Sequence, residues 1–353
     1  MSRPGTADVA APAPPRRALA RSPADALLSA AIAAALAWLA WKLTRWAILD
    51  ATWSGDGIEA CHARGGACWA FVRDKARLIL FGTYPFEEQW RAALATVLVV
   101  ALFVATAVPR LRRPALAWAW LASAAVVVAL MRGGVLGLAH VDTGRWGGLP
   151  LTLVLATVGL ALAFPLGLAL ALARTSRLTV PRILATTYVE LVRGVPLVTV
   201  LFMASVMFPL FLPSGWNLDK LVRAQAGIVL FAAAYLAEVV RGGLQTVPRG
   251  QVEAARALGF GYLGTMRFVV LPQALAAVLP PLVNTAIGLF KDTSLVVVIG
   301  LLDLTNAAKL AMSDPRWLGA VVEGYAFIGT IYFLFCFTLS KLSQSLERSH
   351  AHA

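Results

Sequence analysis

The sequence predicts an all-α integral membrane protein with about eight transmembrane helices. Of its 353 residues, 59% are hydrophobic and 14% are charged, whereas a soluble domain carries roughly 25% charged residues. The apolar residues gather into runs of roughly the 20 residues that a helix needs to cross a bilayer. No segments of about ten residues with alternating polarity recur along the chain, so helices rather than a β-barrel are expected.

The predicted spans can be placed from these apolar runs. They lie near residues 26–48, 92–109, 115–132, 149–172, 190–212, 225–243, 276–300 and 321–341. Residues 1–25 are rich in Ala, Pro and Arg and are expected to form a disordered basic tail. No small-residue cleavage site closes the first apolar run, so we expect that run to be kept as a span.

The spans fall into two regions. Residues 26–148 form an N-terminal extension of three spans, with a sizeable outer loop at about residues 50–91. Residues 149–345 form a five-span domain with a long polar loop at about residues 241–273. Almost all the polar residues found inside apolar runs belong to this second region.

The distribution of Lys and Arg among the short loops predicts the orientation in the membrane. Alternate loops are rich in arginine, which places them in the cytosol together with both chain termini. The arginines of this set are Arg110, Arg112, Arg113, Arg174, Arg177, Arg182, Arg193, Arg241, Arg249, Arg256 and Arg267. The outer loop Asp50–Arg91 departs from the rule, because it also carries five basic residues, Arg64, Arg73, Lys75, Arg77 and Arg91.

The net charge of +13 has its origin in these loops. In a soluble protein such a charge would indicate a nucleic-acid partner, but here it reflects membrane topology and no nucleic acid is expected. The chain has 3 cysteines. Cys61 and Cys68 share the outer loop and could form a disulfide if that loop faces an oxidising compartment. No cluster of Cys and His has zinc-site spacing, so no metal site is expected.

The polar loop predicts two short helices joined by a tight bend. Ala254 and Ala255 follow Glu253 in a helix-favouring stretch, and Gly259 then allows a sharp reversal of the chain. A second helix is expected from about Leu263 to Val270, followed by Leu271 and ended by Pro272. Such a compact knob could seat in a groove of a partner, with Glu253 offering a charge. The alternative is an ordinary amphipathic loop.

Glycines in this loop also match a nucleotide-binding pattern by letter. Gly259, Gly261 and Gly264 have the spacing of the dinucleotide fingerprint, but that motif requires a preceding strand and here a helix precedes it. No G-x-x-x-x-G-K-[ST] motif occurs, so we expect this chain neither to bind nor to hydrolyse ATP.

A second polar cluster interrupts the seventh apolar run. It consists of Asn284, Lys291, Asp292, Thr293 and Ser294. Charged residues at membrane depth are costly and indicate a functional site by default. Pro280 and Pro281, just upstream, would loosen the helix and free backbone groups. The cluster could receive the ammonium and carboxylate of a zwitterionic solute. The alternative is a structural ion pair that joins two helices.

Several long motifs in this region resemble one family. The segments YVELVRGVPLVTVLF (188–202), AYLAEVVRGGLQTVPRGQVEAARALGFG (234–261), LPQALAAVLPPLVN (271–284) and KDTSLVVVIGLLDL (291–304) resemble permease subunits of bacterial ABC importers for polar amino acids. GACWAF (66–71) and YPFEEQW (84–90) resemble the longer, M-type permeases of the general L-amino acid and the glutamate/glutamine/aspartate/asparagine importers. The chain departs from common family residues at Val195 and Phe290.

The resemblance implies a five-helix importer core with a three-helix extension in the bacterial inner membrane. It implies an EAA coupling loop that contacts an ATPase through Glu253, Ala254, Ala255, Gly259, Leu271 and Pro272. It also implies that residues 291–294 lie near the substrate path. The implied partners are a second permease (in a hetero- or homodimer), a cytosolic ATPase dimer that carries ATP and Mg²⁺, and a periplasmic amino-acid-binding protein. No cofactor is implied on this chain.

Two other functional classes are alternatives to a pore subunit for L-amino acids. An ion-coupled secondary carrier would need coupling carboxylates deep in several helices and, commonly, an inverted repeat. A membrane-embedded enzyme would need a catalytic cluster, but His62, His140, His350 and His352 all lie in loops or the tail. The sequence shows neither the repeat nor the cluster, so no catalytic residue is expected.

Overall fold

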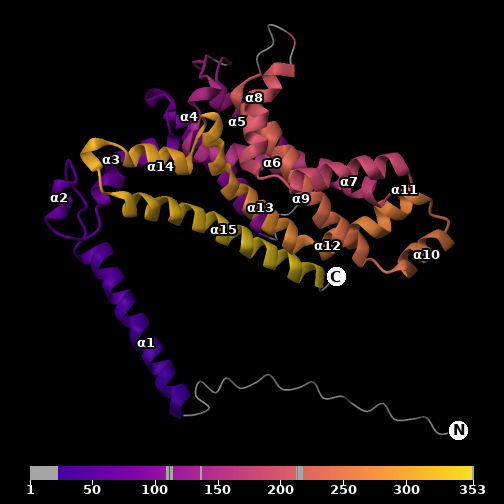
Figure 1. Cartoon of the computed structure of the whole chain (residues 1–353), viewed down its shortest axis with the longest axis horizontal. Helices are drawn as coiled ribbons and strands as arrows, with labels where there is room; N and C mark the ends of the chain where they lie inside the picture. The colour runs from indigo at the N-terminus through magenta and orange to yellow at the C-terminus, as the bar shows by residue number, and fades with distance from the viewer. Residues whose placement is uncertain are drawn as a thin grey trace. The chain divides into compact units, whose positions relative to one another are not determined.

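The computed structural model describes residues 23–108, 111, 114–135, 137–211, 213 and 218–351. These residues are largely helical (Figure 1). They divide into two compact units, Met1–Ala70 and Phe71–Ala353. Most of the tail predicted at residues 1–25 lies outside the described residues, and the first helix, α1, begins at Pro23.

The first unit contains one membrane-length helical segment. α1 (Pro23–Thr44) continues into a π-helical turn, η1 (Arg45–Leu49), and together they form a 27-residue segment that contains an 18-residue window with a mean hydropathy of 1.7. No residue of α1 is buried within the chain. An apolar helix that is exposed on every side requires lipid or another protein around it, in agreement with the predicted first span.

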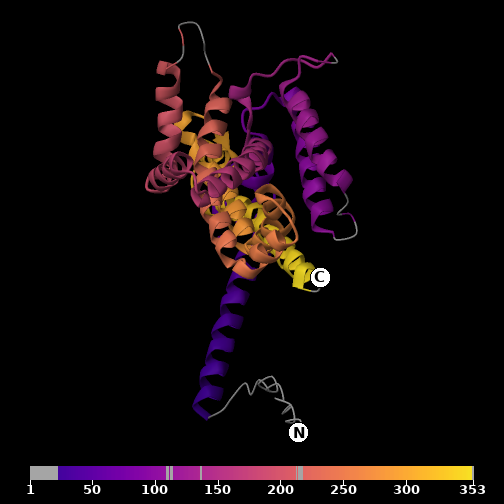
Figure 2. The same cartoon turned by 90° about the vertical axis from the view of Figure 1, so that its right-hand side faces the viewer.

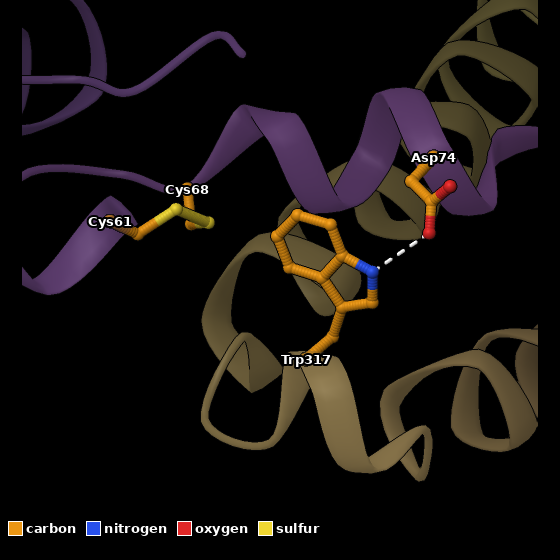
Figure 3. Close-up of a disulfide and its surroundings, with 4 residues drawn as sticks. All are labelled: Cys61, Cys68, Asp74 and Trp317. Carbon is orange, nitrogen blue, oxygen red and sulfur yellow. Dashed lines mark hydrogen bonds between the residues drawn. A yellow bond between two sulfur atoms is a disulfide. The ribbon is translucent and has the colours of Figure 1, made fainter. Parts of the chain in front are cut away.

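A disulfide closes the loop that follows α1. Cys61, in the short helix α2 (Glu59–His62), is bonded to Cys68, and their Cα atoms are 5.4 Å apart (Figure 3). The indole nitrogen of Trp69 donates a 2.7 Å hydrogen bond to the carbonyl oxygen of Ala47, and its ring lies 6.4 Å from that of Trp46. The disulfide therefore closes the loop on itself, and the polar and aromatic contacts of Trp69 tie it to the end of the first span.

The second unit holds the remaining helices. They are α4 (Gln89–Ala107), α5 (Pro114–Arg132), α6 (Gly148–Thr175), α7 (Thr179–Arg193), α8 (Leu197–Phe211), α9 (Lys220–Thr246), α10 (Arg249–Ala257), α11 (Tyr262–Thr265), α12 (Leu271–Ala277), α13 (Leu279–Asp292), α14 (Leu304–Met312) and α15 (Val321–Ala351). α3 (Trp69–Phe81) begins in the first unit and continues into the second. Short helical turns (η2, Phe86–Glu88; η4, Thr143–Arg145; η5, Met266–Val270; η6, Thr293–Ile299; η7, Pro315–Trp317) and a two-residue strand, β1 (Leu302–Asp303), complete it.

The core of the second unit is the pair α6 and α9, which contact each other along their lengths. A Cβ atom at Gly167 of α6 would lie 2.8 Å from the Cβ of Leu236 and 2.9 Å from the carbonyl oxygen of Ala233, both in α9. Small residues allow helices to approach this closely in a membrane, where dispersion contacts replace the hydrophobic effect as the driving force. α13 packs against both helices and against α15.

Seven helical segments of the described residues are long and apolar enough to span a membrane, or up to eight if a bent pair counts as one span. The bent pair is α7 and α8, which meet at an angle of 106°. The predicted span at 190–212 therefore begins too early, because residues 190–193 belong to α7. Pro196 explains the break, since it lacks an amide hydrogen and disfavours a helical conformation for Val195.

The predicted boundary near residue 148 does not separate the compact units. α4 packs against α5, α6 and α15, and α4 and α5 stand side by side as a pair (Figure 2). The side chain of Arg91, in the first turn of α4, is fully buried, with its Nε 2.9 Å from Glu88 and its Nη1 3.0 Å from the carbonyl oxygen of Ala139. The segment at residues 71–148 is therefore built into the same unit as the five-span region.

A polar cluster joins α3 to the turn between α14 and α15. The indole nitrogen of buried Trp317 donates a 2.8 Å hydrogen bond to Asp74 (Figure 3), and Lys75 lies 3.1 Å from Asp74 and 2.7 Å from Asp314. Arg316 lies 3.6 Å from Asp314. We call these five residues the α3 clamp. Burial alone would raise the pKa of Asp74, but the hydrogen bonds from Trp317 and Lys75 outweigh it and lower that pKa.

The clamp should make stability depend on pH in the acid range. Hydrogen bonds from Lys75 and from the backbone N–H of Arg316 lower the pKa of Asp314 from 3.8 to about 2. A carboxylate whose pKa is lower in the folded than in the unfolded state stabilises the fold at pH values above its unfolded pKa. This stabilisation is lost as the pH falls through the folded pKa. Asp314→Asn should therefore lower the melting temperature at pH 7 by a few degrees, and the difference from wild type should shrink as the pH falls from about 4 and vanish below about pH 2. Equal melting temperatures at pH 7 would contradict a stabilising clamp.

Candidate functional site

The polar loop after α9 folds into two short helices, as predicted. α10 (Arg249–Ala257) and α11 (Tyr262–Thr265) are connected by a turn at residues 258–261, and η5 then leads into α12. We call residues 249–270 the helical knob. It lies at the end of the second unit opposite α14 (Figure 1), and α10 packs against α11 and η5.

Gly259 reverses the chain at the end of α10, as the sequence predicts. Its φ is +85°, a left-handed conformation that residues with a Cβ atom adopt at a cost on the order of 1 kcal/mol. The amide of Phe260 donates to the carbonyl of Ala255 (3.1 Å), and the amide of Gly259 donates to that of Arg256 (2.9 Å). These two bonds form a Schellman motif, which satisfies carbonyls at the helix end.

The knob presents side chains that nothing in the described chain covers. Glu253 and Ala254 are exposed, whereas Ala255 is only 3% exposed and anchors α10 from within. At the turn, Leu258 and Leu263 are 79% and 80% exposed. Glu253 forms no ion pair with any described residue. A free carboxylate beside exposed leucines is typical of a surface that contacts a protein partner.

Pro272 does not end the second helix of the knob, contrary to the sequence-based expectation. The π-helical turn η5 runs directly into α12 (Leu271–Ala277), with Pro272 in its first turn. A proline is tolerated there because the first amides of a helix need no intrahelical partner. Leu271 and Pro272 therefore connect the knob to the membrane helices, and the backbone breaks later, at Val278, between α12 and α13.

Two of the five predicted substrate-path residues lie on one uncovered face of α13. Asn284 and Lys291 are exposed and are separated by two helical turns, in line with exposed Pro281 and with Gly288. A Cβ atom at Gly288 would meet no atom within 4 Å. We call these four residues the open face of α13. An amide and an ammonium at membrane depth cannot face lipid at low cost, so this face must border a partner or a polar cavity.

The other three residues of the cluster are placed differently. Thr293 is fully buried and donates a hydrogen bond to the carbonyl of Phe290 (2.8 Å), while the backbone carbonyl of Ser294 accepts a 2.8 Å bond from Asn306. Asp292 is half-buried and makes no hydrogen bond or ion pair with another described residue. The structural ion pair considered as an alternative for Asp292 is therefore not formed between described parts of the chain.

A buried carboxylate near this segment was missed by the sequence reasoning. Asp303 is fully buried and caps α14, accepting bonds from the amides of Thr305 and Asn306 (both 3.1 Å). The hydroxyl of Tyr332, in α15, lies 3.4 Å from Asp303 and 3.1 Å from that of Thr305. The sequence does contain a signal for Asp303. It is an acidic residue directly before a short helical segment, which is typical of an N-cap.

Ionic contacts tie together the ends of α6, α7 and α9 near the knob. The carboxylate of Glu238 lies 2.7 Å from Arg174 and 3.5 Å from Arg193, and it also pairs with Arg241. Glu190 pairs with Arg174 at 3.3 Å rather than with Arg193, its neighbour one turn along α7. The network links three helices, α6, α7 and α9.

Comparison with known proteins bears on what this arrangement does. Residues 163–348 match the family described as "Binding-protein-dependent transport system inner membrane component". The chain is 48% identical over 318 residues to the inner membrane amino-acid ABC transporter permease protein YhdY of Escherichia coli, covering 88% of this chain and 86% of the relative. It is 35% identical over 381 residues to the glutamate/glutamine/aspartate/asparagine transport system permease protein BztC of Rhodobacter capsulatus, covering 89% and 88%.

A solved structure extends the likeness to three dimensions. The crystal structure of an amino acid ABC transporter with histidines matches with a TM-score of 0.51 and 35% identity. The match covers 57% of this chain and 92% of the solved chain.

Proposed function

This chain belongs to the family of binding-protein-dependent transport system inner membrane components, and on that premise we propose that it imports polar L-amino acids across the bacterial inner membrane. It is a permease subunit and works by alternating access, with energy from ATP that a partner hydrolyses. A binding-protein-dependent family favours this function over an ion-coupled secondary carrier, because secondary carriers take their energy from an ion gradient.

The observation that carries the proposal is the exposed helical knob. Its free carboxylate, Glu253, and its exposed leucines, Leu258 and Leu263, are held on a turn that Gly259 shapes. The chain has no phosphate-binding loop of its own. The energy for the transport cycle must therefore come from another protein. The knob is a surface on which a cytosolic ATPase dimer carrying ATP and Mg²⁺ could act.

Leu271 and Pro272 would transmit the movement. They join the knob to α12, which packs against α9, and α13 follows after the break at Val278. A displacement of the knob can thus tilt α13 relative to α6 and α9. The open face of α13 would then be presented alternately to the two sides of the membrane.

A second permease subunit, the same or different, would cover the open face and complete the path. Lys291 offers an ammonium to a substrate carboxylate, Asn284 offers an amide, and half-buried Asp292 offers a carboxylate to a substrate ammonium. A periplasmic binding protein would deliver the amino acid. The outer side would be the side of the Cys61–Cys68 disulfide, because disulfides persist in oxidising compartments.

The orientation of the termini follows from the same reasoning. Placing the knob and the arginine-rich loops in the cytosol puts the α3 clamp outside. The spans then bring both chain ends to the cytosolic side.

The energy source gives the direct test. A strain that lacks this gene and carries it on a plasmid should take up a mixture of labelled polar L-amino acids. Arsenate, which depletes ATP, should stop uptake, and a protonophore added while ATP is maintained should leave most of it. Uptake that survives ATP depletion but collapses with the protonophore would instead identify an ion-coupled carrier.

A further inference from the structure

A cavity of about 610 Å³ lies between the helical knob and the neighbouring helices of the second unit. Its walls come from the turn between α6 and α7, the end of α9, and α10 to η5. The polar lining residues are Thr175, Ser176, Arg177, Gln245, Arg256 and Tyr262. One part of the cavity lining therefore belongs to the membrane helices. The other part belongs to the knob, which would move with the ATPase.

The lining residues favour an anionic ligand. Arg177 and Arg256 contribute two guanidinium groups, and no Asp or Glu is among the residues that line the cavity. Neither arginine forms an ion pair with a described residue, in contrast to Arg174 close by. α7 begins at this wall, so the partial positive charge of its N-terminus adds to that of the arginines. Planar guanidinium groups match the oxygen geometry of phosphates.

Apolar residues also line the cavity, and an apolar surface continues from it along α7. Leu178 lines the cavity and is 67% exposed, and exposed Val180, Ile183 and Leu184 follow it along α7. α7 lies at 106° to α8 and so runs roughly along the membrane plane if α8 crosses it. A helix of this kind, with apolar residues open to one side and arginines beside them, is typical of the membrane–water interface.

We propose that this cavity binds the phosphate group of an anionic phospholipid of the inner leaflet. Arg177 and Arg256 hold the phosphate, Ser176 and Tyr262 offer hydroxyl groups, and an acyl chain lies against Leu178 and the apolar face of α7. The assignment to the inner leaflet rests on the proposed function, which places the knob in the cytosol. Because Arg256 belongs to the knob and Arg177 to the core, a bound lipid would bridge them and favour one position of the knob.

Lipid binding can be measured on the full-length chain without transport. The protein is purified in neutral detergent, mixed with phosphatidylglycerol or with zwitterionic phosphatidylethanolamine, and the bound lipids are counted by native mass spectrometry. We expect preferential retention of phosphatidylglycerol, and roughly tenfold weaker retention in the double variant Arg177→Gln, Arg256→Gln. Arg182→Gln, an exposed change on α7 outside the cavity, is the matched control and should bind as wild type does.

The outcomes separate the possible sources of the anion. Equal retention of phosphatidylglycerol by the double variant and the wild type would overturn the site. Binding of inorganic phosphate together with no preference for phosphatidylglycerol over phosphatidylethanolamine would assign the cavity to free phosphate and overturn the lipid. If the double variant loses its helical circular dichroism, the single Arg177→Gln, at an exposed turn position, gives the same comparison. Since no step requires ATP or an amino acid, failure here is distinct from failure of the importer function.

Discussion

Glu253→Lys is expected to abolish amino-acid uptake while leaving the protein folded in the membrane. Glu253 is exposed on α10 and has no ion-pair partner among the described residues, so its replacement removes no contact that stabilises the fold. Exposed substitutions of this kind change the free energy of unfolding by about 0.5 kcal/mol or less. The reversed charge would instead oppose the ATPase surface. Uptake of labelled amino acids, with membrane abundance from immunoblots, checks the prediction.

A charge reversal elsewhere on the proposed cytosolic side is the control. Lys341→Glu, at an exposed position of α15 far along the chain from the knob, should transport near the wild-type rate. Gly259→Asp tests the shape of the same surface, because an aspartate strains the left-handed position at φ +85° and opens the turn. Wild-type uptake in both knob variants would show that the knob does not couple this chain to its motor.

Gly288→Leu should block transport without destabilising the protein. A Cβ atom at Gly288 meets nothing within 4 Å inside the chain, so a side chain added there starts in open space. Leucine also favours a helix over glycine by about 1 kcal/mol. The side chain would project from the open face of α13 between Asn284 and Lys291. Uptake should fall at least roughly tenfold, while the thermal unfolding of the purified protein stays unchanged or rises.

The matched control is the same substitution at a glycine on another membrane helix. Gly329, in α15, is exposed and likewise has open space around an added Cβ atom. Gly329→Leu should retain uptake. If both variants transport normally, the open face of α13 does not border the substrate path. If only Gly288→Leu fails to assemble with a second permease, that face is an interface between subunits rather than a conduit.

Much of the fold could be predicted because the relevant physics is local. A span must satisfy its backbone hydrogen bonds within itself and match the thickness of the bilayer, so each apolar run specifies a helix on its own. Seven predicted runs agree with observed spans to within about six residues at either end, as 225–243 does with Lys220–Thr246. The reversal at Gly259 was equally local, since a left-handed helix end depends on one residue and two hydrogen bonds.

Errors arose where neighbouring segments decide the outcome. Pro272 was expected to end a helix, but proline is also favoured in a first turn, and only the path of η5 into α12 distinguishes the two. The run at 190–212 looked like one span, yet Pro196 divides it into α7 and α8. The five polar residues at 284–294 formed one cluster in sequence, but helical geometry places Asn284 and Lys291 on the open face and buries Thr293.

The amino-acid sequence by itself determined that this chain crosses a membrane through helices, where those helices lie, and that a polar knob shaped by Gly259 follows the sixth. Tertiary structure alone decided that α3 is fastened to the α14–α15 turn through Trp317, that Asp303 meets Tyr332, and that Arg177 and Arg256 share a cavity. The physical reason is the separation along the sequence over which each interaction acts. Hydrophobic length and backbone hydrogen bonding act over a few residues, whereas side chains far apart in sequence, such as Asp74 and Trp317, meet only after packing brings their helices together.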